Sequence, residues 1–446
     1  MSYCNKKNIK VGLISLGCDK NLVDSEFMLG VLKKHNYVIT NKADEAEIII
    51  VNTCGFIQSA KQESIDTLFQ MSKYKKKGNC RYLIAAGCLA QRYKGQLLQG
   101  MPELDAVVGT GNFHMINEVI QKLDGARINL TSDRVFIDYD INHRVKIYPN
   151  ISFVKIADGC SNRCSYCAIP QIKGPYRSRD MESIRKEVEL LLADGTKEIN
   201  LVAQNTSAYG IDIYGKPSLI GLLKQLIKIK GDFWIRLLYT YPTDVDDELL
   251  ETVVGSPKIA NYLDIPMQHV NDRILKLMNR PMNGVLIRRL IEKIRGKFPE
   301  LTLRSTFIVG FPTETDDEFG ELIDFTKTYK IDKLGVFKYS CEEGTRAAVI
   351  KPHIPPKIKQ QRYQQLMSVQ REISLLNNKK LEGKLLRVLA ERYNYNDNIY
   401  VGRSEKDAPG VDGLVFFKGD KCVPGNLYNV RIKKAKEYDL IGEVEY

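Results

Sequence analysis

Short apolar runs alternate with longer amphipathic stretches over about the first 130 residues. The runs at residues 9–16, 46–52 and 81–86 are rich in Ile, Val, Leu and Ala, and residues 106–109 form a shorter fourth run. Runs of this length suit strands that are buried on both faces. Helical patterns lie between them, so this part of the chain is predicted to form βαβ units around a parallel sheet.

The same alternation resumes near residue 151 and continues to about residue 351. Between the apolar runs, segments such as residues 181–193 and 286–297 have the spacing of amphipathic helices. The runs that predict strands are residues 152–156, 198–203, 233–239, 262–265, 302–309 and 333–337. Six such strands favour an incomplete (β/α) barrel over a full eight-stranded one, with functional groups at the carboxyl ends of the strands.

The pattern changes again near residue 354. Residues 354–380 predict one connecting helix, and beyond residue 381 apolar and polar positions alternate in short runs bounded by turn residues. These runs, at residues 384–390, 413–417 and 426–432, predict a small β-barrel.

The expected fold class is therefore α/β, with a parallel α/β domain, an incomplete barrel and a small β-barrel in that order. The predicted domains are residues 1–135, 145–375 and 381–446, and residues 131–150 are expected to be a linker or an edge hairpin.

Composition narrows the class of protein. The chain has 446 residues, and 43% of them are hydrophobic, which is ordinary for a globular protein. No apolar stretch approaches the roughly 18 residues of a transmembrane helix, and the first residues lack the apolar core of a signal peptide. A cytoplasmic protein without a membrane partner is expected. In that reducing compartment, ten cysteines indicate metal or redox use instead of disulfides.

The formal charge of +12 leaves two interpretations open. It fits an acidic partner such as RNA or a ribonucleoprotein, or a lysine-rich surface that is merely solvated. The last domain is nearly neutral, with eleven Lys and Arg against ten Asp and Glu from Lys384 to Tyr446. A dedicated RNA-binding domain is normally strongly basic, so this neutrality favours a basic protein as the substrate.

Cys160, Cys164 and Cys167 form the most informative motif, a CxxxCxxC run. Three thiolates leave one iron of a four-iron cluster without a protein ligand, and an open metal position is where a substrate binds. A zinc knuckle is the alternative, but it needs a fourth ligand, and neither a second CxxC nor a histidine pair lies nearby. The run therefore favours an iron–sulfur cluster with one open iron.

Cys18, Cys54 and Cys88 form a second set, because each follows a predicted strand of the first sheet and has a glycine beside it. The carboxyl ends of parallel strands share one edge, so three thiols that are far apart in sequence are expected to converge there. The alternative is three small buried thiols without a ligand. The repeated placement favours a second three-cysteine cluster. Cys4, Cys80, Cys341 and Cys422 have no partner at a useful spacing and are interpreted as ordinary thiols.

With both cysteine sets, the barrel and the terminal β-barrel, the chain resembles the methylthiotransferases, a family of radical S-adenosylmethionine enzymes. One branch of that family modifies an aspartate of ribosomal protein S12, and the other modifies a hypermodified adenosine of tRNA. Residues 15–26 and 164–179 are similar to the ribosomal-protein branch, although Asp19 stands where a proline is more usual. The tRNA reaction remains the alternative function.

The resemblance implies two [4Fe-4S] clusters, S-adenosylmethionine and a C-terminal TRAM domain. Cys160, Cys164 and Cys167 would hold the cluster that cleaves S-adenosylmethionine, and the other set would hold an auxiliary cluster that carries the added sulfur. The implied partners are S12, free or in the small ribosomal subunit, and an electron donor protein, with tRNA less favoured. A non-enzymatic nucleic-acid-binding module, the third hypothesis, leaves six cysteines in two sets unexplained.

Other residues are expected to contact S-adenosylmethionine, and no catalytic residue is predicted beyond the cluster ligands. An aromatic residue beside the last cysteine packs against the adenine in the family, and polar residues at strand ends could meet the nucleoside or methionine part. Each could instead pack or hydrogen-bond within its own loop. The candidates are Tyr166, Gln204, Asn205, Gln268, Arg304 and Gly310.

Overall fold

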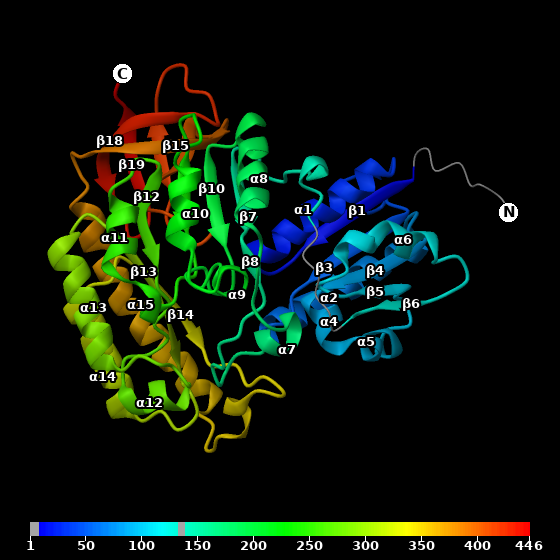
Figure 1. Ribbon diagram of the computed structural model, residues 1–446, viewed down its shortest axis with the longest axis horizontal. Coiled ribbons are helices and arrows are strands. Elements are labelled where there is room, and N and C mark those ends of the chain that lie inside the picture. The colour runs from blue at the N-terminus through cyan, green and yellow to red at the C-terminus, as the bar shows by residue number, and fades with distance from the viewer. Residues whose placement is uncertain (1–8, 133–138) are drawn as a thin grey trace.

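The computed structural model describes residues 9–132 and 139–446. Cys4 and residues 133–138 of the expected linker lie outside the described residues. The blue and cyan part of Figure 1 is a six-stranded sheet with the order β2-β1-β3-β4-β5-β6, and every neighbouring pair is parallel. Its strands are β1 (Lys10–Ser15), β2 (Val38–Ile39), β3 (Ile48–Thr53), β4 (Tyr82–Gly87), β5 (Ala106–Val108) and β6 (Ile128–Leu130).

Helices connect these strands and cover the sheet. The four predicted strands are confirmed as β1, β3, β4 and β5. The other two were not predicted, because β2 has only two residues and the three residues of β6 include the exposed Asn129, so neither forms a continuous apolar run. The helices that matter for the site are α1 (Asp19–Lys34), α2 (Gln58–Ser72) and α4 (Cys88–Tyr93). Each begins shortly after the carboxyl end of a strand.

The central sheet has the order β14-β13-β12-β11-β10-β7 and is parallel throughout. It does not close, so the predicted incomplete barrel of six strands is confirmed. The strands are β7 (Ile151–Lys155), β10 (Glu198–Val202), β11 (Trp234–Leu237), β12 (Ile259–Asp264), β13 (Thr302–Val309) and β14 (Lys333–Lys338). The main covering helices are α8 (Met181–Ala193), α10 (Leu219–Leu226), α11 (Asp247–Val254), α13 (Gly284–Lys297) and α14 (Asp316–Tyr329).

A long helix, α15 (Pro356–Lys379), leads to a closed barrel with the order β15-β16-β17-β19-β18. The small β-barrel is thus confirmed. Two of its strands were not predicted, because Gly402 and Gly442 interrupt their apolar patterns. A Cβ at Gly402 would lie 2.1 Å from the carbonyl oxygen of Leu389, so the glycine allows the close strand packing. The strands are β15 (Leu385–Asn394), β16 (Ile399–Ser404), β17 (Val415–Lys418), β18 (Leu427–Ala435) and β19 (Leu440–Val444).

One of the hydrophobic clusters spans all three parts of the molecule. Phe27 of α1, Trp234 of β11 and Leu389 of β15 belong to the same cluster of buried residues. The N-terminal sheet lies beside β7 and α8, and the C-terminal barrel lies near the amino ends of the central strands (Figure 1). Contacts between Glu198, at the start of β10, and Arg403 agree with this placement. The C-terminal barrel therefore leaves the carboxyl ends of the central strands available for a functional site.

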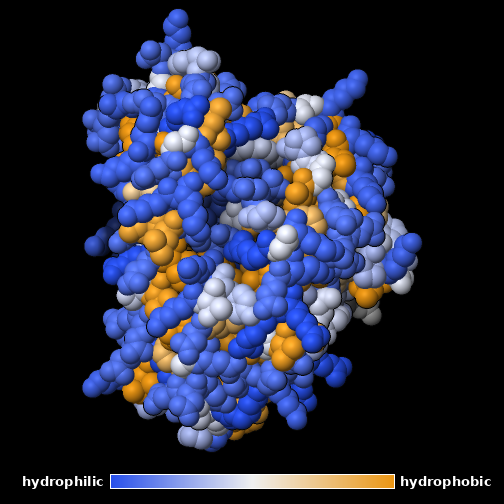
Figure 2. All heavy atoms as spheres, turned by 90° about the vertical axis from the view of Figure 1, so that its left-hand side faces the viewer, coloured by the Kyte–Doolittle hydropathy of each residue, from blue (hydrophilic) through white to orange (hydrophobic). Residues whose placement is uncertain are grey.

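The face in Figure 2 is mostly hydrophilic, with apolar side chains in limited strips. Exposed apolar residues of the molecule include Val285 and Leu286 at the start of α13. Within residues 9–132 and 139–446, none of the helices combines the length and the apolar character needed to cross a membrane.

Candidate functional site

Cys18, Cys54 and Cys88 lie where the carboxyl edge of the first sheet meets the helices. Cys18 is the N-cap of α1, Cys54 follows β3 directly, and Cys88 is the first residue of α4. A Cβ on Gly17 would lie 2.7 Å from the Cβ of Cys54, and one on Gly55 would lie 2.9 Å from the carbonyl oxygen of Cys88. The structure therefore brings the three loops into contact, as the sequence predicts.

Two asparagines that the sequence reasoning missed hold these loops together. The amide of Asn21 donates to the carbonyl oxygens of Leu16, at 3.1 Å, and Thr53, at 2.9 Å. The amide of Asn52 donates to the carbonyl oxygen of Asn21 at 2.7 Å and to the hydroxyl of Ser25 at 2.8 Å. Both asparagines are almost fully buried. The sequence did contain a signal for both residues. Asn52 stands inside an apolar strand and Asn21 stands close to a cysteine, and a buried polar amide needs hydrogen-bond partners.

The donor set fits a soft metal group. Burial is the main cause that raises the pKa of Cys54, and burial followed by the nearby thiols raises the pKa of Cys88 to about 12. The thiols of Cys54 and Cys88 would stay neutral unless a cationic group stabilised their thiolates. Iron–sulfur clusters are bound by Cys thiolates and supply that positive charge. Cys18 is exposed, so the set is open to one side.

Cys160, Cys164 and Cys167 lie between β8 (Ala157–Asp158) and α7 (Ile169–Lys173). Gly159 has φ near 79°, and a Cβ there would lie 2.1 Å from the carbonyl oxygen of Pro175, so the loop requires glycine. Burial, then the other two thiols, raises the pKa of Cys167 to about 12. This second donor set therefore fits a cationic cluster for the same reason.

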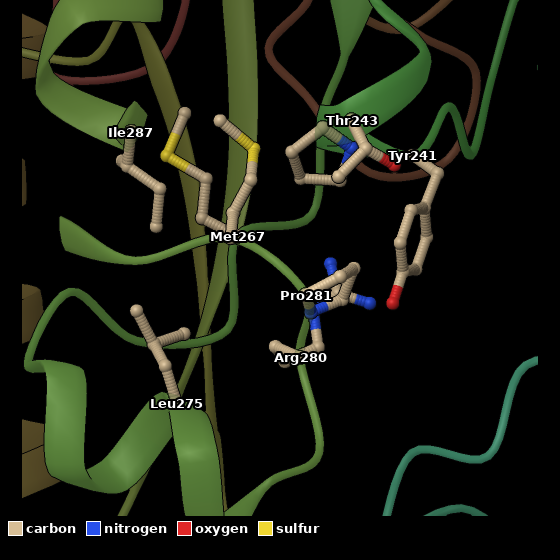
Figure 3. Close-up of a pocket in the computed structure, with 9 residues that line it drawn as sticks. Tyr241, Thr243, Met267, Leu275, Arg280, Pro281 and Ile287 are labelled. Atoms are coloured by element: carbon tan, nitrogen blue, oxygen red, sulfur yellow. The ribbon is translucent and has the colours of Figure 1, made fainter. Parts of the chain in front are cut away.

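Arg280 is a further residue of this site that the sequence did not reveal. Its guanidinium donates to the sulfur of Cys164 at 3.7 Å and to the carbonyl oxygen of Pro266 at 2.6 Å. It also lies 4.0 Å from the ring centroid of Tyr241, and Figure 3 shows the two side chains next to each other in a pocket. Met267, on the same pocket wall, is apolar. Only tertiary folding joins these segments, so no local pattern indicated Arg280.

Among the predicted contacts of S-adenosylmethionine outside the cysteine loop, Gln204 is held against Asp158, close to the start of that loop. Its amide nitrogen donates to Asp158 at 2.9 Å, and its buried Oε1 has no partner within the described residues. The backbone carbonyl of Asn205 accepts from Tyr176 at 2.8 Å, and its side chain accepts from Ser207. Gln204 therefore offers an open acceptor, whereas Asn205 is occupied in holding its own loop.

The other four candidates are spread over the barrel. Tyr166 packs against an apolar cluster that includes Phe311. Gln268 has φ near 77° and bridges to β13 through its backbone. Gly310 donates its amide to Glu314. Arg304 pairs with Asp264 at 3.0 Å and with Asp412 of the C-terminal barrel at 3.5 Å, which turns it away from the cysteine loop. Ligand contacts of all six stay predictions.

A buried ionic network joins the two cysteine sets. Asp24 of α1 pairs with Lys155 of β7, and its second oxygen lies 3.4 Å from the ammonium of Lys173, at the end of α7. That ammonium also lies 3.3 Å from Asp158, the residue before Gly159. Burial opposes the charge on Lys173, but Asp158 and Asp24 raise its pKa. The network fixes the N-terminal sheet against the loop of Cys160.

Across the part of the chain that the structure describes, no three or more His, Cys, Asp or Glu side chains surround a position for a single metal ion. A one-ion zinc site therefore has no geometric support. In a four-iron cluster each thiolate binds a different iron, so single-ion geometry is not required there. The nine described cysteines are all free.

Three family profiles match successive parts of the chain. They are "Uncharacterized protein family UPF0004" at residues 10–109, the radical SAM superfamily at residues 154–326 and the TRAM domain at residues 383–444. The match to the radical SAM superfamily runs from the end of β7 through β13 and includes the loop of Cys160, whereas β14 lies beyond it.

Curated relatives are similar over nearly the whole chain. The ribosomal protein uS12 methylthiotransferase RimO of Pelotomaculum thermopropionicum is 49% identical over 439 residues, which are 98% of this chain and 99% of the relative. The protein with that name from Acetivibrio thermocellus is 46% identical over 445 residues, which are 98% of each chain. The aligned regions therefore include both cysteine sets.

A solved structure has a similar fold at low identity. The radical S-adenosylmethionine methyltransferase TsrM from Kitasatospora setae, with cobalamin and a [4Fe-4S] cluster bound, aligns with a TM-score of 0.56 at 12% identity. The alignment covers 77% of each chain. At this identity the likeness supports the fold alone.

Proposed function

The chain belongs to the RimO family of radical S-adenosylmethionine methylthiotransferases, and from this premise we propose that it adds a methylthio group to the β-carbon of an aspartate in ribosomal protein uS12. The chain is an enzyme, a transferase of the radical S-adenosylmethionine type. The observation that carries the proposal is the pair of three-cysteine sets, each at the carboxyl edge of its own parallel sheet and joined by the Asp24 network.

Membership of the radical S-adenosylmethionine superfamily implies S-adenosylmethionine and one [4Fe-4S] cluster. We assign that cluster to Cys160, Cys164 and Cys167. When bound, such a cluster supplies the electron that cleaves S-adenosylmethionine to a carbon radical. We also propose a second [4Fe-4S] cluster on Cys18, Cys54 and Cys88, supported by the convergence of their loops and by the burial of Cys54 and Cys88.

The residues around the first set have separate tasks. Arg280 is held by Pro266 and Tyr241, so its positive charge stays beside the sulfur of Cys164. Gln204 is held by Asp158 and presents its unpaired Oε1 as an acceptor for an amino group of the cofactor. Tyr166 excludes water from the loop because it packs with Phe311. These tasks are binding and orientation.

We propose uS12, free or in the small ribosomal subunit, as the macromolecular partner, with a protein electron donor as the second partner. A ribosomal substrate supports a cytoplasmic location. For the division of labour, we propose residues 1–135 for the auxiliary cluster, residues 145–375 for radical generation and residues 381–446 as the TRAM domain.

The test is anaerobic incubation of the reconstituted enzyme with S-adenosylmethionine, sulfide and a reductant, with both uS12 and tRNA present. Mass spectrometry should find a methylthio gain on one aspartate of uS12, and the tRNA should be unchanged. A gain on tRNA adenosine alone would overturn the proposal in favour of the other branch of the methylthiotransferases. Heat-treated enzyme serves as the control.

A further inference from the structure

The first turn of α1, just after Cys18, carries a largely covered lysine, Lys20, that forms no ion pair within the described residues. Lys20 is 8% exposed, yet its ammonium forms no hydrogen bond or ion pair with any residue in the described ranges. Its one close contact is the ring of Tyr239, whose centroid lies 3.3 Å from Nζ. A buried charge normally has a partner, because desolvation is costly. The Lys20 ammonium has a cation–π contact but no ion pair, so it is free to bind an anion.

Neighbouring cations, unlike Lys20, have carboxylate partners. Lys155 and Lys173 both pair with Asp24, and Arg304 pairs with Asp264 and Asp412. Their charges are already balanced inside the protein. Lys20 thus differs from these three cations because it has no ion pair.

The nearest carboxylate belongs to Asp19, and it has another partner. The hydroxyl of Tyr239 donates to Oδ2 of Asp19 at 3.0 Å. Tyr239 itself has φ near 64°, a conformation that is strained for a non-glycine residue and is concentrated at functional sites. Its amide donates to Asp264, and its carbonyl accepts from Thr206, so both sides of the strained residue are fixed. Tyr239 therefore holds Lys20 and Asp19 in place.

The location is suited to an anion that enters from solvent. Lys20 is in the first turn of α1, a helix of 16 residues whose amino end carries positive partial charge. Cys18 and Gly17, immediately before the helix, are exposed, so a ligand can reach this end of the site. Lys20 is two residues from Cys18 and contacts a tyrosine from the carboxyl end of β11. A bound anion would lie between the two sheets that carry the cysteine sets.

We propose that the ammonium of Lys20 binds the side-chain carboxylate of the aspartate that the enzyme modifies. The inference rests on the proposed function, because the aspartate of uS12 is the anionic group which that reaction must place between the cysteine sets. Lys20 is then a specificity-determining residue. It selects an acidic side chain and would give no advantage to a neutral adenosine base.

The test is a double-mutant cycle on the reconstituted holoenzyme with S-adenosylmethionine present. Binding of labelled uS12 is measured by fluorescence anisotropy, with the native protein and with the modified aspartate replaced by asparagine. The native enzyme should prefer the aspartate form by about tenfold or more, as expected for a close charge pair. Lys20→Met should bind both forms with equal affinity, and Lys20→Arg should recover part of the preference.

Lys33→Met is the matched control, because Lys33 is an exposed lysine at the other end of α1. It should keep the full preference. Equal weakening of both uS12 forms in Lys20→Met, with the tenfold preference retained, would overturn the inference and indicate a structural role. If Lys20→Met does not bind iron on reconstitution, Lys20→Gln is measured in its place. A retained tenfold preference for the aspartate form would again overturn the inference.

Failure of the proposed function has a different signature. If the native enzyme transfers no methylthio group to uS12, the function is wrong. If the native enzyme modifies uS12 but does not distinguish aspartate from asparagine in binding, only the assignment to Lys20 is wrong.

Discussion

The proposed division of labour between the two cysteine sets can be tested at single cysteines. Cys164 belongs to the set that matches the radical SAM superfamily, whereas Cys54 belongs to the N-terminal sheet. Cys164→Ala should abolish both methylthio transfer and 5′-deoxyadenosine. Cys54→Ala should abolish the transfer but leave 5′-deoxyadenosine, which chromatography of the anaerobic reaction measures. Cys422→Ala, in the C-terminal barrel, is the control and should keep both products. Loss of 5′-deoxyadenosine in Cys54→Ala would contradict the division.

A single glycine sets the approach of two cysteine loops. Gly17 has φ near 88°, and a Cβ would lie 2.7 Å from the Cβ and 3.0 Å from the sulfur of Cys54. Gly17→Ala should destabilise the N-terminal domain by about 1–3 kcal/mol, because it adds both overpacking and backbone strain. It should also lower the iron bound after reconstitution, measured with the shift in Tm.

Gly100→Ala provides the comparison for that experiment. Gly100 lies at the end of α5 (Gly95–Gly100), and an added Cβ there meets nothing within 4 Å. The control should change neither Tm nor iron content by a comparable amount. If Gly17→Ala binds as much iron as the native protein, the close approach of the two loops is not needed for iron binding and the prediction is wrong.

At the scale of elements, Glu342 ties the loop after β14 to two helices of the N-terminal sheet. Its buried carboxylate lies 2.9 Å from Lys61 of α2 and 2.7 Å from Arg92 of α4. Glu342→Gln should cost about 3–5 kcal/mol, because it leaves two cations with a neutral partner. Urea unfolding measures this loss. Glu63→Gln, a surface change on α2, should stay within about 0.5 kcal/mol.

The same contact has a pH dependence with a definite sign. Burial opposes ionisation of Glu342, but its hydrogen bonds with Lys61, Ser340 and Arg92 lower its pKa below the usual 4.5. The unfolded chain therefore binds the proton more readily, and the stabilisation is complete above about pH 4.5. It is lost as the pH falls through the lower folded pKa. The stability gap between native protein and Glu342→Gln should narrow in that range, and a constant gap would contradict this account.

The elements themselves were largely predictable, because their hydrophobic periodicity is local. All six strands of the open barrel and the long helix α15 lie where residues 152–337 and 354–380 predict them. The missed strands have a common cause. β2 and β6 form no continuous apolar run, and β16 and β19 contain glycines whose packing role appears only when a neighbouring strand is present.

At the scale of the whole molecule, the C-terminal barrel is locked to the central one by a buried ion cluster. Glu198 of β10 accepts from both Arg403 of β16 and Arg236 of β11, and all three are almost fully buried. Although burial opposes it, the two arginines lower the pKa of Glu198. Glu198→Gln should loosen the C-terminal barrel, seen as faster limited proteolysis between α15 and β15. Glu443→Gln, an exposed change on β19, should leave the cleavage rate unchanged.

The sequence by itself determined the fold class and the order of the three parts, and it predicted which six cysteines hold the clusters. Periodicity and motif spacing are properties of neighbouring residues, so they can be read without coordinates. The placement of Cys18, Cys54 and Cys88 at strand ends was also predictable, since parallel strands end at one edge.

Only the tertiary structure decided which charges face one another. Arg280 beside Cys164, Asp24 between Lys155 and Lys173, and Lys20 over Tyr239 join segments that are 116 to 219 residues apart. Arg304 illustrates the same point, because the sequence predicts a cofactor contact for it and only the fold reveals its two carboxylate partners. Pairing over such separations depends on how whole domains dock. No local pattern encodes it, because each charged residue alone is equally compatible with a solvated surface.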